Sequence, residues 1–117
     1  MEKISLEQRD IVLLPFPFSN QSGVKVRPAV ILSNNEFNHS EDLIVAGITS
    51  NISKGKYTFQ IDENKLELKN IKDNCCIKVE NLLKIDKQLV IKKIDKVKSE
   101  EFEKLIPILN SIFSTKK

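Results

Sequence analysis

The sequence lacks a hydrophobic run long enough to cross a membrane, and it has few residues that could form disulfides or bind metal ions. No apolar stretch approaches the roughly 18 residues that a membrane span needs. The only histidine is His39, and the two cysteines, Cys75 and Cys76, are neighbours in the chain. Adjacent cysteines do not build a disulfide framework, and no further ligands stand at a known metal-site spacing. We therefore expect no membrane contact and no cofactor, and interpret the cysteines as small strand residues, with a redox or metal role as the alternative.

Length and charge are typical of one small globular domain. The chain has 117 residues, of which 40% are hydrophobic and 30% charged, so we predict a single domain over residues 1–117. The net charge of +3 is too small to indicate a nucleic-acid-binding protein by itself. Residues 51–98 carry 12 basic and 7 acidic side chains, which fits either a phosphate-facing stripe or a lysine-rich solvated surface. The polar N-terminus does not resemble a signal peptide, so we expect a cytoplasmic protein.

Apolar runs separated by polar turns predict a mainly β, α+β fold. The expected strands are 10–14 (continuing weakly to 18), 29–32, 42–48, 57–61, 75–79, 84–86 and 88–94. Pro15 and Pro17 remove two backbone donors, and they predict that the end of the first strand lies at a sheet edge or exit. Residues 19–24 are predicted to form a turn-rich loop.

The apolar period changes in the last part of the chain. Hydrophobic residues recur there at helical spacing: Phe102, Leu105, Ile106, Leu109, Ile112 and Phe113. Ser99 is the expected N-cap, and Glu100 and Glu101 suit the positive start of a helix. Pro107 lies inside the pattern and predicts a kink or a break. Many short strands followed by one helix predict a small barrel-like antiparallel sheet over about residues 9–96, capped by a helix over about 99–113.

Arg27 is the most informative single residue of the first two predicted strands. It follows the polar loop and stands directly before Pro28 and the second strand. This order predicts a fixed positive charge at a strand entrance, where a site for an anion could be built. Taken alone, a surface arginine in a salt bridge is the simpler interpretation.

Four segments occur in a fixed order: RDIVLLPFPF, KVRPAVILSN, DLIVAGITS and CCIKVENLLKIDKQLVIKKI. Together they resemble the PemK/MazF family of toxins, the RNA-cleaving halves of type II toxin–antitoxin pairs, from about Arg9 to the C-terminal helix. The resemblance implies an SH3-like small β-barrel, a homodimer, growth inhibition and a cognate antitoxin, which usually supplies the DNA binding of the complex. It also implies a metal-independent endoribonuclease that cleaves single-stranded RNA at short sequences.

Three positions at turns depart from the family pattern. Arg9-Asp10 stands where the first strand usually opens with Gly-Asp, so a turn glycine is lost and the start of that strand is expected to differ. Gly47 replaces the proline that often precedes the hydrophobic-Thr-Ser motif, and Ile94-Asp95 replaces a frequent Ile-Gly. These departures affect turns more than chemistry.

The resemblance implies that the 2′-hydroxyl of the RNA is the nucleophile. Cleavage then needs a base, an acid for the departing 5′-oxygen, and positive charge for the phosphate. Arg27 matches the family's catalytic arginine, whose guanidinium can bind two phosphate oxygens and stabilise the transition state. Thr49 and Ser50 match the family's Thr-Ser pair, whose hydroxyls can donate to phosphate oxygens. Strand-end turn residues are the alternative interpretation of that pair.

Lys78 and Glu80 stand two residues apart on a predicted strand, so both side chains should leave the same face. Several family members carry an arginine and an aspartate at these positions, assigned as acid and base. Here the Glu80 carboxylate could take the 2′-OH proton, and Lys78 could stabilise the phosphate or protonate the leaving oxygen. The alternative is a solvated strand face with a weak ion pair.

The loop from Ser19 to Lys25 is expected to flank the RNA groove, since the resemblance places it there and implies that it moves when antitoxin binds. The predicted RNA-binding residues are Ser19, Asn20, Lys25 and Ser50. His39 is interpreted as a plain loop residue.

The chain also holds aromatic residues that could bind RNA. Phe16, Phe18 and Phe37 are assigned to core or dimer burial, with base stacking as the alternative.

Two functions other than an endoribonuclease remain open. One is a non-catalytic SH3-like barrel that binds RNA or a protein partner. The other is a DNA-binding regulator, although no helix-turn-helix pattern is visible.

Overall fold

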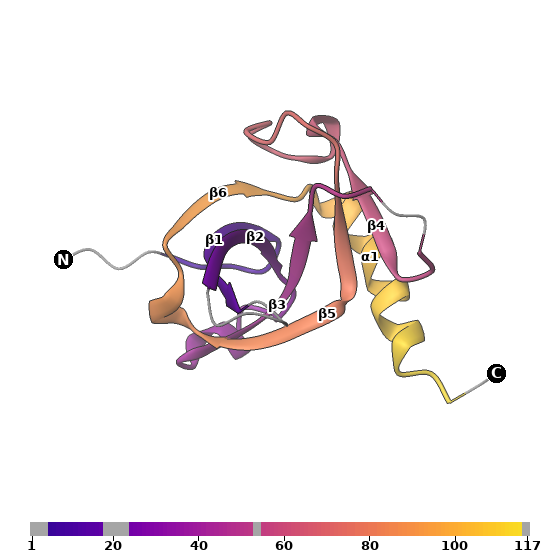
Figure 1. Ribbon diagram of the computed structural model, residues 1–117. Helices are drawn as coiled ribbons and strands as arrows, with labels where there is room; N and C mark the ends of the chain where they lie inside the picture. The colour runs from indigo at the N-terminus through magenta and orange to yellow at the C-terminus, as the bar shows by residue number, and fades with distance from the viewer. Residues whose placement is uncertain (1–4, 18–23, 53–54, 116–117) are drawn as a thin grey trace.

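The computed structural model describes residues 5–17, 24–52 and 55–115 of the chain. Six strands form one curled antiparallel sheet in the order β4-β5-β3-β2-β1-β6 (Figure 1). The strands are β1 (Asp10–Pro17), β2 (Val24–Ile31), β3 (Asp42–Thr49), β4 (Thr58–Ile61), β5 (Cys75–Asp86) and β6 (Lys92–Lys96). The helices are α1 (Ser99–Ile112) and the short 3-10 helices η1 (Phe37–His39), η2 (Glu63–Lys65) and η3 (Lys87–Leu89). The predicted mainly β fold with a C-terminal helix is confirmed.

The two edge strands are joined beyond their ends, so the sheet curls into a half-barrel. Leu66, which follows β4, forms an antiparallel bridge with Val97, which follows β6. Beside this bridge, the Glu67 N–H donates to the Lys96 carbonyl at 2.8 Å. The segment after β4 therefore covers part of the edge that β6 would otherwise leave open.

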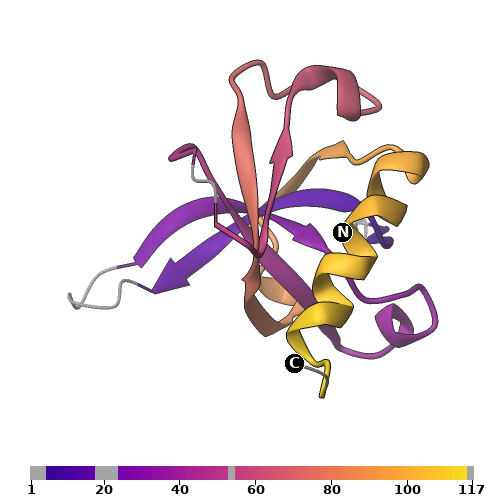
Figure 2. The ribbon, with the colours of Figure 1, turned by 90° about the vertical axis from the view of Figure 1, so that its right-hand side faces the viewer.

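β1 and β2 continue beyond the rest of the sheet as a two-stranded ribbon, seen in profile in Figure 2. The pairing of β1 with β2 extends to Pro17, whereas β6 pairs only with residues 10–13 of β1. On the other side, β3 pairs only with residues 29–31 of β2. Pro15 and Pro17 therefore lie where β1 has a strand neighbour on one side only, as the sequence predicted.

Three strand predictions need correction. The pieces predicted at 75–79 and 84–86 form one strand, β5, because an irregularity in its pairing with β3 interrupts the apolar alternation without ending the strand. The strand predicted at 88–94 is η3 followed by β6, because the Asp86 carboxylate accepts the Gln88 N–H at 2.8 Å and starts a helical turn. β2 begins at Val24, so Arg27 and Lys25 lie inside a strand rather than at its entrance or in the loop.

The helix α1 differs from its prediction at two points. Its N-cap residue is Lys98 and not Ser99, because the first helical residue is Ser99 itself. Pro107 lies within the helix and does not split it, since the helix continues to Ile112. Pro107 and the residue four positions earlier, Glu103, are exposed, so the carbonyl left without a partner can bind water. No helix in the described part of the chain is long and apolar enough to span a bilayer.

Buried side chains form two clusters on opposite faces of β1, β2 and β3, because successive residues of a strand point to opposite sides. The first cluster includes Ile11, Val30 and Ala46 and packs against Phe102 and Leu105 of α1. The second cluster occupies the other face and consists of Val12, Leu14, Phe16, Ala29, Ile31, Leu43, Val45, Ile85 and Val90.

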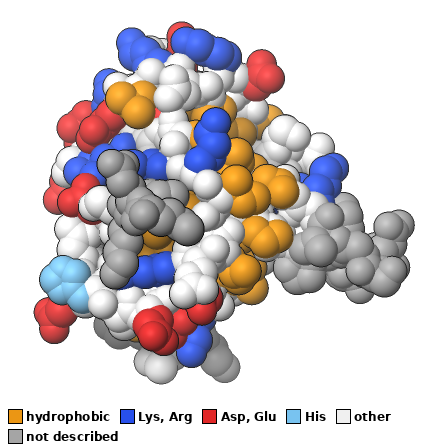
Figure 3. All heavy atoms as spheres, turned by 90° about the vertical axis from the view of Figure 1, so that its left-hand side faces the viewer, with side chains coloured by type: hydrophobic (Ala, Val, Ile, Leu, Met, Phe, Trp, Pro, Cys, Tyr) orange, Lys and Arg blue, Asp and Glu red, His pale blue; other side chains and the backbone are white. Residues whose placement is uncertain are grey.

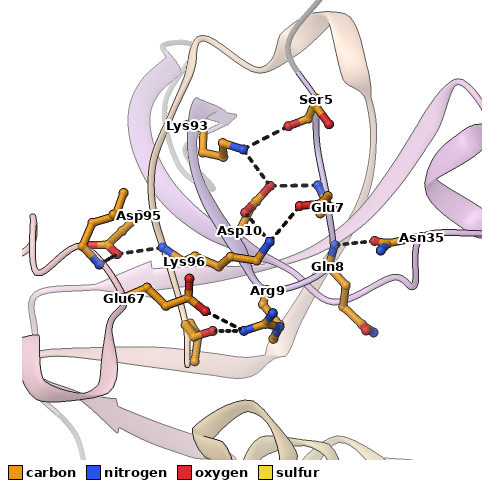
Figure 4. A network of polar contacts seen from close by, with 12 residues as sticks. Ser5, Glu7, Gln8, Arg9, Asp10, Asn35, Glu67, Lys93, Asp95 and Lys96 are labelled. Carbon is orange, nitrogen blue, oxygen red and sulfur yellow. Dashed lines mark hydrogen bonds and ion pairs between the residues drawn. The ribbon is translucent and has the colours of Figure 1, made fainter. Parts of the chain in front are cut away.

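A network of charged groups ties the start of β1 to β6 (Figure 4). Asp10 is fully buried, and its Oδ2 accepts the Glu7 N–H at 2.8 Å. The Nζ atoms of Lys93 and Lys96 each lie 3.5 Å from one of its carboxylate oxygens. Lys96 also donates to Glu7 Oε1 at 2.8 Å, and this hydrogen bond raises the pKa of Lys96 and lowers the pKa of Glu7. The buried carboxylate is thus compensated by two cations and a backbone donor.

Arg9, next to this network, has a backbone φ of 80°, in the left-handed region that favours glycine. It occupies the position where the toxins that the sequence resembles usually have the glycine of Gly-Asp. Its guanidinium makes contacts that glycine could not: Nη1 donates to Glu67 Oε2 at 3.0 Å and to the Val97 carbonyl at 2.8 Å. Side-chain hydrogen bonds therefore offset an unfavourable backbone conformation.

Two substitutions of Arg9 separate these effects. We expect Arg9→Ala to lower the free energy of unfolding by about 1–2 kcal/mol, since it loses both hydrogen bonds and keeps the unfavourable φ. Arg9→Gly loses the same bonds but relieves the backbone, so it should be about 1 kcal/mol more stable than Arg9→Ala. Urea unfolding curves of both variants and the parent measure the difference. Equal stability of the two variants would show that the backbone at Arg9 is not strained.

Candidate functional site

Arg27 and Thr49 lie at one end of the same sheet face. β2 and β3 pair at Ala29 and Gly47. Arg27 stands two residues before Ala29, and Thr49 stands two residues after Gly47. Side chains two residues apart leave the same face of a strand, about 7 Å from each other along it. Both residues are half-buried, so an arginine and a hydroxyl border the place where the β1–β2 ribbon leaves the sheet.

β5 adds Lys78 and Glu80 to this face. Thr49 pairs with Cys76 of β5, and Lys78 is the next residue on the same side of that strand. The Lys78 Nζ lies 3.8 Å from Glu80 Oε2, and 35% and 45% of the two side chains are exposed. An ion pair this exposed contributes at most about 1 kcal/mol to stability, so a ligand can replace either group as the partner of the other.

The pairing of β3 with β5 is irregular at this place. Gly47 alone lies opposite residues 78–81 of β5. Before the irregularity Val79 packs in the cluster that contains α1, whereas after it Ile85 packs in the cluster on the other face. β5 therefore exchanges its inner and outer sides across this bulge, and Figure 1 shows the strand bending along its length. The bulge carries both Lys78 and Glu80.

Gly47 leaves room for Asn81, the last residue of the bulge. A Cβ atom at Gly47 would lie 2.7 Å from Asn81 Nδ2 and 3.5 Å from Cε2 of Phe16. The φ of Gly47 is not positive, so the glycine is needed for space and not for its backbone conformation. The carboxamide of Asn81 consequently lies on the same face as Thr49 and Arg27.

The end of β3 forms a turn. The Thr49 Oγ1 atom accepts the Asn51 N–H at 3.1 Å, which is the hydrogen bond of a strand-end turn. A hydroxyl oxygen that accepts this bond keeps its own hydrogen free to donate elsewhere. Ser50 is exposed directly after the strand. Both interpretations of the Thr-Ser pair, turn and phosphate ligand, are therefore compatible with the geometry.

The β1–β2 ribbon holds a further predicted RNA-binding residue. Lys25 is exposed on β2, two residues from Arg27 on the same side. It pairs with Phe16 of β1, which is buried in the second core cluster. Ser19 and Asn20 lie outside the described residues.

The chain matches the sequence profile of the PemK-like, MazF-like toxins of type II toxin–antitoxin systems over residues 7–113. It belongs to this family. No curated protein matches the chain.

Solved structures of the family have the same fold. The MazE-MazF complex of Deinococcus radiodurans is similar with a TM-score of 0.78 and 13% identity, covering 97% of this chain and 100% of that one. An endoribonuclease in complex with its cognate antitoxin from a mycobacterial species has a TM-score of 0.74 and 14% identity, covering 97% and 99%. The Mycobacterium tuberculosis toxin MazF-mt6 has a TM-score of 0.73 and 17% identity, covering 90% and 96%.

The two cysteines of this PemK/MazF-family chain are buried. Cys75 and Cys76 are both free thiols. Burial raises the pKa of the Cys75 thiol to about 11, so it is not a nucleophile at neutral pH. In the described part of the chain, no three or more His, Cys, Asp or Glu side chains gather where they could hold a metal ion.

The aromatic residues and the histidine divide between core and surface. Phe16 is buried as predicted, whereas Phe37 is 38% exposed on η1 and Phe18 lies outside the described residues. His39 ends η1 and is exposed, which agrees with a plain loop residue.

Asn81 lies on the sheet face of Arg27 and Thr49, and the sequence analysis missed it. The departure at Gly47 was the available signal, because a small residue on a strand often marks a close approach.

Proposed function

We propose that this chain is the toxin of a type II toxin–antitoxin system and a sequence-specific, metal-independent endoribonuclease. Its substrate is single-stranded RNA. In the cell this RNA is mRNA, and its cleavage inhibits growth. The observation that carries the proposal is that three strands of a PemK/MazF-family fold bring four chemically suitable groups to one face, namely Arg27, Thr49, Lys78 and Glu80.

Arg27 is assigned to the phosphate. A guanidinium stays charged at any relevant pH and donates two parallel hydrogen bonds, which suits a phosphate that gains charge as it becomes five-coordinate. The Thr49 hydroxyl keeps its hydrogen free while its oxygen accepts the Asn51 N–H, so it can donate to the same phosphate. Together they fix the reacting group without a metal ion.

Glu80 and Lys78 are assigned to proton transfer. When an RNA phosphate replaces Glu80 as the partner of Lys78, the carboxylate becomes free to take the proton of the 2′-hydroxyl. The 2′-oxygen then forms its bond to phosphorus while the bond from phosphorus to the 5′-oxygen breaks. Lys78 gives a proton to that departing oxygen. At the end of the reaction Glu80 has gained one proton and Lys78 has lost one. The distance of 3.8 Å between them supports this exchange.

The RNA groove is assigned to the ribbon and the end of β3, with Ser19, Asn20, Lys25 and Ser50 as contacts. A cognate antitoxin is proposed to cover this groove and to supply DNA binding for the complex. Two structures with the same fold support such a partner, since one is a MazE-MazF complex and the other an endoribonuclease bound to its cognate antitoxin.

A homodimer is proposed because an apolar surface of the ribbon lacks cover. Val26 and Ile91 are each 51% exposed. Val26 pairs with Pro15, and the Ile91 N–H donates to the Leu13 carbonyl at 2.8 Å, so Val26 and Ile91 flank β1 from its two sides. Figure 3 shows hydrophobic side chains gathered in a band on this side of the molecule, with charged groups beside it. A second copy of the chain would bury this surface.

We expect Val26→Glu to convert the dimer to a monomer, since it places a charge in an apolar contact. Size-exclusion chromatography with light scattering measures the mass. Leu68→Glu is the matched control, because Leu68 is 63% exposed but lies after η2, away from the ribbon. A monomeric parent protein, or a dimer that persists in Val26→Glu, would contradict this interface.

One alternative function is favoured by a specific residue. Lys78 stands where several family members have arginine, and lysine lacks the two-pronged donor geometry of a guanidinium. If lysine cannot replace it, the chain is a non-catalytic SH3-like barrel that binds RNA or a protein partner. Incubating the purified protein with single-stranded RNA in EDTA separates the two functions, because only the nuclease produces fragments.

A further inference from the structure

Asn81 presents an unused amide on the face of the candidate site. The residue is exposed, yet its Nδ2 lies in the space that a side chain at Gly47 would fill. Within the described part of the chain, its carboxamide has no hydrogen-bond partner. An exposed amide that lies against Gly47, with its donor and acceptor both unused, is available to bind a ligand.

The position of this amide relates it to the proposed phosphate groups. Gly47 precedes Thr49 by two residues and pairs with Ala29, which follows Arg27 by two residues. The amide therefore lies one step, about 7 Å, along the same face from the arginine and the hydroxyl. In a nucleotide the sugar likewise separates the base from the phosphate.

We infer that Asn81 is a specificity-determining residue whose carboxamide reads the edge of one RNA base beside the cleaved bond. The inference rests on the proposed function and deepens it. A phosphate offers only acceptors, and Arg27 and Lys78 already supply donors for it. A base edge offers a donor next to an acceptor, which is the pattern that a carboxamide complements and a lysine or arginine does not.

Gly47 acts as a positioning residue for this contact. An alanine at position 47 would place its Cβ 2.7 Å from Asn81 Nδ2, which is closer than the atoms can approach. The neighbouring Phe16 ring, at 3.5 Å, is at an ordinary contact distance and need not move. Gly47→Ala therefore displaces the amide while leaving the backbone and the core in place.

The experiment is cleavage of a single-stranded RNA pool of random sequence by the full-length protein, with sequencing of the new ends. We expect Asn81→Ala to relax the preference at one nucleotide position by about tenfold, without an equal loss at every sequence. Asn81→Asp keeps the acceptor and loses the donors, so it should change the preferred base at that same position. Thermal melting should be unaltered, since Asn81 is exposed.

A double-mutant comparison tests the role of Gly47. We expect Gly47→Ala to relax the same position as Asn81→Ala, and to add nothing when Asn81 is already alanine. An unchanged sequence preference in Asn81→Ala, or an equal loss of rate at all sequences, would overturn the inference. So would a Gly47→Ala effect of the same size in both backgrounds, because it would not act through the amide.

Failure of the proposed function gives a different result. If the parent protein binds RNA without cleaving it, the bound sequences are selected and compared instead, and the same relaxation at one position is expected for Asn81→Ala. The nuclease proposal then fails while the reading of a base by Asn81 stands. A parent protein that neither cleaves nor binds the pool overturns both.

Discussion

Arg27→Ala is expected to lower the rate of RNA cleavage by about 100- to 1,000-fold while the fold is retained. The reason is that Arg27 is the fixed cation of the candidate site, placed beside Thr49 by the pairing of β2 with β3. In the proposed mechanism its loss removes the two-pronged donor that stabilises the charge of the transition state. Single-turnover cleavage of a defined RNA measures the effect, and circular dichroism with thermal melting verifies the fold.

Two further variants make this result specific. Arg27→Lys keeps the charge but loses the two-pronged geometry, so we expect a rate between those of the parent and the alanine variant. Lys92→Ala removes an exposed cation from β6 and should leave cleavage unchanged. Full activity in a folded Arg27→Ala protein would place the site elsewhere on the molecule.

Glu80→Gln is expected to lower the rate constant of cleavage by about 100- to 10,000-fold, with a much smaller change in RNA affinity. The substitution keeps the size of the side chain and removes the carboxylate that we propose as the base for the 2′-OH proton. It does not remove a phosphate contact, because an anion does not bind the phosphate. Single-turnover rates and equilibrium binding of a non-cleavable RNA separate the two effects.

A control for charge is available on the helix. Glu103→Gln makes the same change at an exposed position of α1, and both the rate and the affinity should stay at the parent values. Lys78→Arg restores the residue that several family members carry and should keep or raise activity. Equal losses in rate and affinity for Glu80→Gln would favour a binding module over a nuclease.

The parts of the fold that repeat a simple pattern could be predicted from the sequence. β3 was predicted at 42–48 and observed as Asp42–Thr49, because its apolar run is continuous and both faces are packed. β5 was predicted as two pieces because the bulge opposite Gly47 shifts the alternation in the middle of the strand. Such a bulge depends on the partner strand and is not visible in a single segment.

The candidate site also has one part that the sequence predicts and another that depends on tertiary structure. The shared face of Lys78 and Glu80 follows from their spacing alone, and the structure places them 3.8 Å apart. The position of Arg27 next to Thr49 requires the register of β2 on β3, which local sequence does not contain. The role of Asn81 depends on the missing side chain at Gly47, which is a tertiary property, so the sequence analysis did not find it.

The most direct test of the proposed chemistry is cleavage of two matched oligonucleotides in EDTA. One is a single-stranded RNA that contains a mapped cleavage site, and the other carries a 2′-deoxy nucleotide on the 5′ side of the cleaved bond. We expect the RNA to be cleaved and the 2′-deoxy oligonucleotide to remain intact, because the proposed mechanism uses the 2′-hydroxyl as nucleophile and needs no metal ion. An uncleaved RNA, or equal cleavage of both oligonucleotides, would contradict a metal-independent ribonuclease that uses Arg27 and Glu80 in this way.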